Sequence, residues 1–371
     1  MVRATNETRR ARGGTSTAAP RRAVVRDLSG IEASYQVDFD ARTAYDFVIS
    51  LTIGTGEDSD LLPEDVRWLK QSRAALGVEE SDLESCFGGK SKGVFHGLAA
   101  AVVELPELRD AASVVAYFEH ASVSQITRHV LSEAVRDETS QGLVDRIVGG
   151  DADAIAELEP RLPEYSRDEL VEYLRDPAPP IERMRSALAG WLPLYQQVED
   201  RVERILGRDV ATRRVDRATL DPGALIERTT GGLRWLPDGQ VRRVVMAPSY
   251  FSRPYNYIFQ GTTWRVFCYP VADTALGSAD PVTPPQAMVR LFRALGDPTR
   301  LRILKLLGDR DHYLTELATQ LELSKPTMKH HLALLRAAGV VTVTEEGSLT
   351  YYSIRRERLE EAGVDLRRFL D

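Results

Sequence analysis

Residues 291–304 read LFRALGDPTRLRIL, and residues 324–341 read SKPTMKHHLALLRAAGVV. In the first stretch, Gly296 ends one helical pattern. Asp297 caps the next helix, with Pro298 at its first position, where a missing N–H costs nothing. The core face of the first helix is predicted to hold the apolar residues at 288, 291, 292 and 295. The core face of the second, which ends at Gly308, is predicted to hold Leu301, Ile303, Leu304 and Leu307.

The second stretch predicts an amphipathic helix over 325–338, capped by Ser324 and ended by Gly339. A short helix before it is predicted to face the core with Leu317, Ala318 and Leu321. On a helical wheel, one face of the capped helix is apolar and consists of Met328, Leu332 and Leu335. The other face carries small, cationic and hydrogen-bonding side chains, the kind of surface that fits a DNA major groove.

Two β-rich runs follow, at 340–344 and 349–354, around Glu345-Glu346-Gly347-Ser348, and predict a hairpin. This order of helix, turn, helix and hairpin resembles the ArsR-type winged helix-turn-helix transcription regulators. The resemblance covers roughly residue 286 to the C-terminus and depends on the two quoted stretches together. It implies that the helix at 325–338 reads the major groove and that the first and last helices form a homodimer.

The resemblance also implies a double-stranded DNA operator, which for a dimer is an inverted repeat. The implied DNA-contacting residues are Ser324, Lys325, Pro326, Thr327, Lys329, His330 and Ala333. Members that sense metals often carry a Cys-x-Cys pair in the third helix, or histidine and acidic ligands in the last. Residues 311–318 contain no cysteine and residues 359–370 no histidine, so we expect no metal site and no cofactor. The acidic wing tip, Glu345-Glu346, is not expected to approach phosphates closely.

Charge is distributed unevenly along the 371 residues, which leave room for more than one domain. The net charge is −7, but residues 1–30 carry +5, residues 286–371 carry +2, and the remainder carries −14. The acidic part of the chain is therefore separate from the segment that resembles a DNA-binding module. The net negative charge of the whole chain also argues against a general nucleic-acid coat protein.

Residues 1–30 are rich in Arg, Thr, Ala and Gly, which predicts a disordered basic arm. We favour a solvated tail, or a start codon placed too early, over an arm that touches DNA. Two cysteines, Cys86 and Cys268, do not predict a disulfide scaffold. Without a secretory signal or an apolar run near 18 residues, we expect a cytoplasmic protein with no membrane contact.

The fold class is predicted to be mostly α with minor β. Residues 31–271 are expected to form a mainly helical sensing or assembly domain with a small β element. Strands are predicted at 35–39, 241–246 and 264–269, and the longest helix at 181–206. Residues 272–285, with three prolines, are predicted to be a linker to a winged helix-turn-helix domain at 286–371.

The aromatic stretch before the predicted linker is the best candidate for a pocket for a small organic effector. The candidate lining residues are Tyr250, Phe251, Arg253, Tyr255, Tyr257 and Trp264, with Asn256 and Arg265 as further polar anchors. The alternative is that these aromatic side chains fill a core between strands and helices, which is the commoner role for any single one.

The leading hypothesis is a homodimeric repressor that binds specific DNA and is controlled by an effector through residues 31–271. One alternative is an enzyme fused to a DNA-binding module, although no catalytic motif is evident. Gly88-Gly89-Lys90-Ser91 resembles the end of a phosphate-binding loop, but Glu84 stands where that loop needs its first glycine. The other alternative is that residues 31–285 only assemble the dimer.

Overall fold

The computed structural model describes residues 35–53, 60–87, 93–132, 134–135, 137–164, 166–236, 240–277, 282–346 and 349–371. The predicted basic arm at 1–30, the motif at 88–91 and part of the predicted linker, at 278–281, lie outside these residues. The side chains of Glu345 and Glu346 at the wing tip also lie outside the description. The described residues are mostly helical with a minor share of strands, which confirms the predicted fold class.

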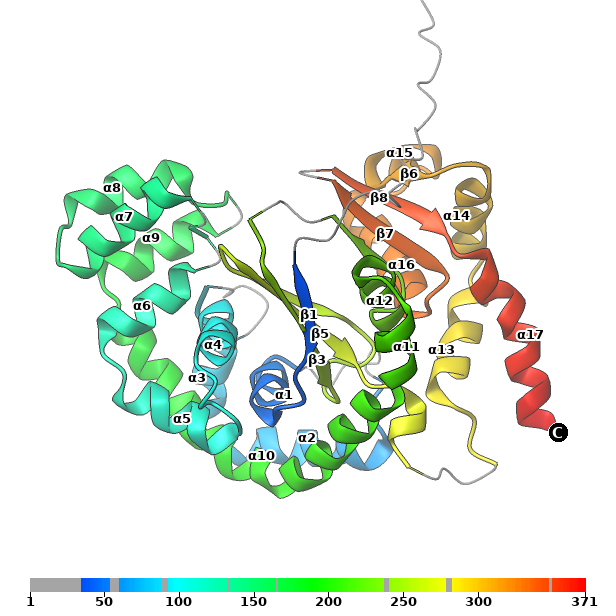
Figure 1. Ribbon diagram of the computed structural model, residues 1–371, viewed down its shortest axis with the longest axis horizontal. Helices are drawn as coiled ribbons and strands as arrows, with labels where there is room; N and C mark the ends of the chain where they lie inside the picture. The colour runs from blue at the N-terminus through cyan, green and yellow to red at the C-terminus, as the bar shows by residue number, and fades with distance from the viewer. Residues whose placement is uncertain are drawn as a thin grey trace, which may run out of the picture. The chain divides into compact units, whose positions relative to one another are not determined.

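Helices dominate the described chain before residue 230 (Figure 1). Their bounds are α1 Thr43–Ser50, α2 Pro63–Ala75, α3 Val78–Phe87, α4 Gly93–Glu104, α5 Ala111–His120, α6 Val123–Leu131, α7 Glu138–Val148, α8 Asp153–Leu158, the 3-10 helix η1 Glu159–Arg161, α9 Arg167–Arg175, α10 Ala178–Thr212, α11 Arg214–Thr219 and α12 Pro222–Thr229. None of the described helices combines the length and the hydropathy needed to cross a bilayer.

The long helix α10 organises the helical part of the chain. It packs against α1, α3 and α5, and it extends beyond the predicted 181–206 at both ends. The buried stripe of α10 includes Met184, Leu188, Trp191, Tyr195 and Val202, one to two turns apart. These side chains belong to the large core that α1 to α6 and α9 share, so this stripe is core.

A four-stranded sheet packs on these helices. Its strands are β1 Gln36–Phe39, β3 Arg243–Ser249, β4 Tyr257–Gln260 and β5 Trp264–Pro270, in the order β1-β3-β5-β4. Strands β1, β3 and β5 run parallel, and β4 runs antiparallel to β5. The continuous apolar runs of β3 and β5 suit strands that are buried on both faces.

The two faces of this sheet belong to different cores. Val245 and Val266 join the helical core, whereas their neighbours Val244 and Phe267 point the other way. The second face packs against α12, against the short strand β2 Leu233–Trp235, and against Val343 of the wing.

The C-terminal elements form the predicted winged helix-turn-helix. They are α13 Gln286–Leu295, α14 Pro298–Asp309, β6 His312–Tyr313, α15 Leu314–Gln320, α16 Lys325–Ala337, β7 Val341–Glu346, β8 Leu349–Ile354 and α17 Arg356–Leu370. Their shared core contains most of the predicted residues, among them Leu291, Ile303, Leu317, Met328 and Leu335. The prediction was wrong for two residues: Phe292 is 41% exposed and Leu301 is 51% exposed.

The wing is part of a second four-stranded sheet, in the order β2-β7-β8-β6. Strand β2 comes from the chain before the predicted linker and pairs parallel with β7, with Leu233 opposite Val343. After β5, the described start of the predicted linker forms the 3-10 helix η2 Asp273–Ala275. The Ala272 N–H donates to buried Asp209 of α10 at 2.8 Å. The proposed domain boundaries stay a prediction.

Candidate nucleic-acid interface

Helix α16 begins at a well-formed cap. The Ser324 hydroxyl accepts the backbone N–H of Thr327 at 3.2 Å and shares a hydrogen bond with the Thr327 hydroxyl at 2.7 Å. Pro326 lies in the first turn, and Gly339, with φ of 73°, follows the helix in the left-handed conformation that favours glycine. The sequence signals for the start and the end of this helix therefore correspond to its observed bounds.

The two faces of α16 differ as the helical wheel predicts. Met328, Leu332 and Leu335 are buried against α13, α14 and α15. The candidate contact residues Ser324, Lys325, Pro326, Thr327, Lys329 and His330 are all exposed, and Ala333 is half-buried. The packing of the buried face fixes the orientation of α16 about its own axis. The opposite, polar face therefore points to solvent.

The charges on this face are not neutralised within the described part of the chain. Lys325 and Lys329 are one turn apart, and no described carboxylate forms an ion pair with either. Two like charges at this spacing disfavour each other slightly in an isolated helix. A phosphate group nearby would turn that repulsion into attraction.

His331, next to the exposed His330, is turned inward. Its Nδ1 lies 4.0 Å from a carboxylate oxygen of Asp297, the residue that caps α14. Burial lowers the pKa of His331, and Asp297 only partly offsets this effect. His331 thus belongs to the packing between α14 and α16, and His330 to the polar face.

The turn between α15 and α16 is tight. Glu322 has φ of 56°, in the left-handed region that side chains other than glycine seldom adopt. Beside it, the Leu323 N–H donates to the Ala318 carbonyl at 2.9 Å and closes the end of α15. This geometry sets the angle at which α16 leaves the short helix.

The structure does not gather the predicted effector-pocket residues around one cavity. Tyr250 and Phe251 are buried in the helical core, where the Tyr250 hydroxyl donates to Asp65 and the Phe251 ring packs on Trp68 with ring centroids 5.5 Å apart. Tyr257 is half-buried on β4. Trp264 donates to Glu104 at 3.2 Å and lines a separate hollow of about 300 Å³.

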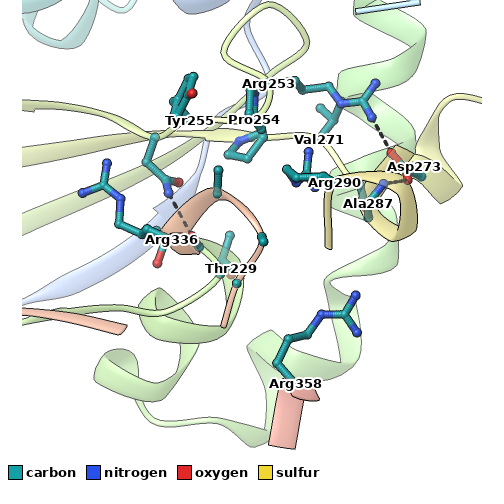
Figure 2. Close-up of a pocket in the computed structure, with 18 of the residues that line it drawn as sticks. Thr229, Arg253, Pro254, Tyr255, Val271, Asp273, Ala287, Arg290, Arg336 and Arg358 are labelled. Carbon is teal, nitrogen blue, oxygen red and sulfur yellow. Dashed lines mark hydrogen bonds and ion pairs between the residues drawn. The ribbon is translucent and has the colours of Figure 1, made fainter. Parts of the chain in front are cut away.

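Arg253 and Tyr255 do line a hollow, but its other walls come from elsewhere in the chain (Figure 2). It has a volume of about 260 Å³ and reaches the end of α16 and the start of α17. Most of its charged lining consists of arginines from separate parts of the sequence, namely Arg213, Arg228, Arg253, Arg290, Arg336, Arg355 and Arg358. No sequence motif joins these positions, so the sequence analysis did not find them.

Comparisons with known proteins match the C-terminal module. A family described as a helix-turn-helix domain matches residues 295–344, which span α14 to most of β7. An uncharacterised HTH-type transcriptional regulator of Methanocaldococcus jannaschii is 40% identical over 19% of this chain and 81% of its own length. The transcriptional repressor SdpR of Bacillus subtilis is 36% identical over 20% of this chain and 83% of its own.

The HTH-type transcriptional regulator KmtR of Mycobacterium tuberculosis is 34% identical over 23% of this chain and 68% of its own length. These relatives are matched over most of their length, and each match covers less than a quarter of the present chain. The family match at residues 295–344 includes the whole of α16 and therefore the polar face described above. Through this module, the chain belongs to the ArsR-type helix-turn-helix family of DNA-binding transcriptional regulators.

Proposed function

We propose that the protein is a homodimeric repressor that reads the major groove of an inverted-repeat operator with α16. The observation that carries this proposal is the exposed polar face of a helix whose opposite face is buried. Lysines on this face suit backbone phosphates, and Thr327 and His330 offer hydrogen bonds to base edges. Ser324 and Pro326 at the start of the helix, with Ala333 one turn beyond Lys329, complete the proposed contact set.

A dimer is supported by apolar side chains left exposed on α13 and α17. These helices are in contact, and Figure 1 shows them side by side, in yellow and red. Phe292 on α13 and Val364, Leu366 and Leu370 on α17 are exposed, with Leu370 at 72%. A second copy that covered them would remove this apolar surface from water. Repression is supported by the relative SdpR, which is named as a transcriptional repressor.

Residues 31–271 would then bind an effector or assemble the dimer rather than catalyse a reaction. Residues 272–285 would connect them to the winged helix-turn-helix domain at 286–371. An effector that binds before residue 286 acts only if it favours one placement of the two α16 helices. The parallel pairing of β2 with β7 offers a direct mechanical connection between the two segments.

The test is selection of bound duplexes from random genomic fragments with the purified full-length protein, followed by footprinting. We expect protection of two half-sites about one helical turn apart or a multiple of it. A single protected half-site bound by a monomer would contradict the dimeric arrangement. Failure to enrich any sequence would contradict specific reading by α16.

A further inference from the structure

We propose that the arginine-lined hollow between the Arg253–Asn256 turn and the C-terminal end of α16 binds a small phosphate-bearing anion. Its walls come from the end of α12, the turn before β4, the segment after β5, α13, the end of α16 and the start of α17. Figure 2 shows Arg253, Arg290, Arg336 and Arg358 around it. We refer to it below as the arginine pocket.

The lining is strongly cationic. Among the described lining residues are seven arginines and one carboxylate, that of Asp273. A smaller hollow of about 80 Å³ shares Tyr255 and Arg290 with it and adds Arg293 and Arg300, together with the carboxylate of Asp60. Like charges brought together in a partly enclosed site repel each other, so such a cluster attracts an anionic occupant.

Carboxylates in and around the pocket neutralise only part of this charge. Arg253 pairs with Asp273, Arg290 with Asp60, Arg213 with Asp209, Arg228 with Asp216, and Arg358 with Asp365. Two arginines remain without a carboxylate partner in the described structure. Arg355 donates to the carbonyl oxygens of Gly231 and Gly339. The guanidinium of Arg336 forms neither a hydrogen bond nor an ion pair with any described residue.

Buried polar atoms of the lining also lack partners. Arg253 is only 3% exposed, and its Nη1 has no acceptor within the described structure. The same is true of Arg290 Nε, and Asn256 Oδ1 accepts no hydrogen bond. A buried donor without an acceptor costs about 1–3 kcal/mol, so native proteins rarely leave one unpaired. An oxyanion in the pocket would supply the missing acceptors after small side-chain adjustments.

Arg290 shows how closely the positive charges of the pocket are packed. It pairs with Asp60, yet burial, and then the nearby guanidinium of Arg358, lower the pKa of Arg290 to about 10. A bound anion between these side chains would oppose both effects.

Phosphate suits the pocket better than an uncharged organic molecule. Guanidinium groups offer paired N–H donors that match the oxygens of a phosphate group. The volume of about 260 Å³ accommodates a compact phosphate ester rather than a large hydrophobic ligand. Asn256 Oδ1 could then accept a hydrogen bond from a hydroxyl group of such an ester.

The position of the pocket links the ligand to the DNA-reading helix. Residues 336–339 line it at the end of α16, and Arg290 lines it from α13. An anion held there contacts α16 and the segment before residue 286 at once, so its binding would bias their relative placement. This role as effector site rests on the proposed function, whereas the binding itself does not.

Isothermal titration calorimetry of the full-length protein with inorganic phosphate and pyrophosphate, at constant ionic strength, tests the binding. We expect saturable binding that is weakened about tenfold or more in Arg336→Gln, because one charge-assisted hydrogen bond is lost. Arg228→Gln, at the rim, should weaken it less. The matched control is Arg175→Gln, an exposed arginine on α9 outside the pocket, which should bind as the wild type does. Circular dichroism confirms that each variant is folded.

Absence of saturable binding, or equal binding by Arg336→Gln and the wild type, would overturn the proposal. Random-sequence duplex added as a competitor distinguishes a small anion from DNA phosphate. If Arg336→Gln weakens binding of this duplex as much as it weakens binding of pyrophosphate, the arginines belong to the DNA-binding surface and the assignment is wrong. Operator affinity measured with and without pyrophosphate is a separate readout. If pyrophosphate binding depends on Arg336 but operator affinity does not change with pyrophosphate, the effector role is contradicted and the anion site is still supported.

Discussion

Arg355 donates a hydrogen bond from Nη1 to the carbonyl oxygen of Gly231 at 2.9 Å, across 124 residues of sequence. The same nitrogen donates to the Gly339 carbonyl at 3.2 Å, directly after α16. Next to this contact, the Val343 N–H donates to the Gly232 carbonyl at 3.2 Å, and β2 continues alongside β7. One guanidinium thus connects the end of α16 to the segment that precedes β2.

Replacing Arg355 should destabilise this connection. Arg355→Met keeps much of the aliphatic stem but leaves two carbonyl groups without their charged donor, which we expect to cost about 1–3 kcal/mol of unfolding free energy. Urea denaturation measures this difference, with Arg175→Met on the exposed surface of α9 as the matched control. Equal losses of unfolding free energy in the two variants would show that the hydrogen bonds of Arg355 do not stabilise the fold specifically.

Asp46 predicts a pH dependence of stability. It is fully buried and accepts hydrogen bonds from Ser249 Oγ, from the Phe251 N–H and from the Tyr195 hydroxyl. Burial outweighs these bonds and raises the pKa of Asp46 to about 6. Between pH about 4 and about 6 the folded state therefore holds a proton that the unfolded state has lost.

The contribution of Asp46 to the unfolding free energy should consequently fall as pH rises through this window, by about 3 kcal/mol. Denaturant unfolding of the wild type and Asp46→Asn, at a series of pH values, isolates this contribution as the difference between the two curves. Asp200→Asn, on the exposed side of α10, is the control and should run parallel to the wild type. Parallel curves for Asp46→Asn as well would contradict the assignment.

The two thiols lead to a prediction about metals. Cys86 and Cys268 are both buried, and burial raises the pKa of each thiol, which disfavours the thiolate that binds soft metals. We expect zinc, cadmium and arsenite to leave operator affinity unchanged in anisotropy titrations. A metal-dependent loss of binding that disappears in Cys86→Ser would refute this expectation.

The proposed dimer contact can be tested at Phe292. A charge at this exposed apolar position should prevent a second copy from covering α13 and α17, so Phe292→Glu should be monomeric in multi-angle light scattering. The control is Val215→Glu, because Val215 is an even more exposed apolar residue and lies on α11. A dimer that persists in Phe292→Glu and in a Leu366→Glu, Leu370→Glu double variant would place the interface elsewhere.

Local signals made the winged helix-turn-helix predictable. Asp297, Ser324 and Gly339 mark helix ends through their own short-range hydrogen bonds or backbone conformation, and all three do so in the structure. Phe292 and Leu301 were assigned to the core because helical periodicity cannot distinguish a buried apolar face from one left open. That distinction depends on neighbouring elements and on partners.

Long-range pairing was not predictable from single segments. Strand β2 is three residues long, and its partner, β7, comes much later in the chain. The aromatic stretch from Tyr250 to Trp264 predicts either an effector pocket or a packed core, and its members lie in different environments. The arginines of the arginine pocket come from separate parts of the sequence, so only the folded chain brings them together.

We propose that the exposed face of α16 reads operator DNA. The proposal is tested by fluorescence anisotropy of selected operator and random duplexes over a range of salt concentrations, with Lys70→Ala, at an exposed position of α2, as the control. Lys329→Ala should weaken binding to every duplex and lower the salt slope by about one. Thr327→Ala and His330→Ala should each cost about 1–3 kcal/mol at the selected operator only. Unchanged operator affinity in all three variants, or an equal loss in Lys70→Ala, would contradict the assignment of α16 as the reading helix.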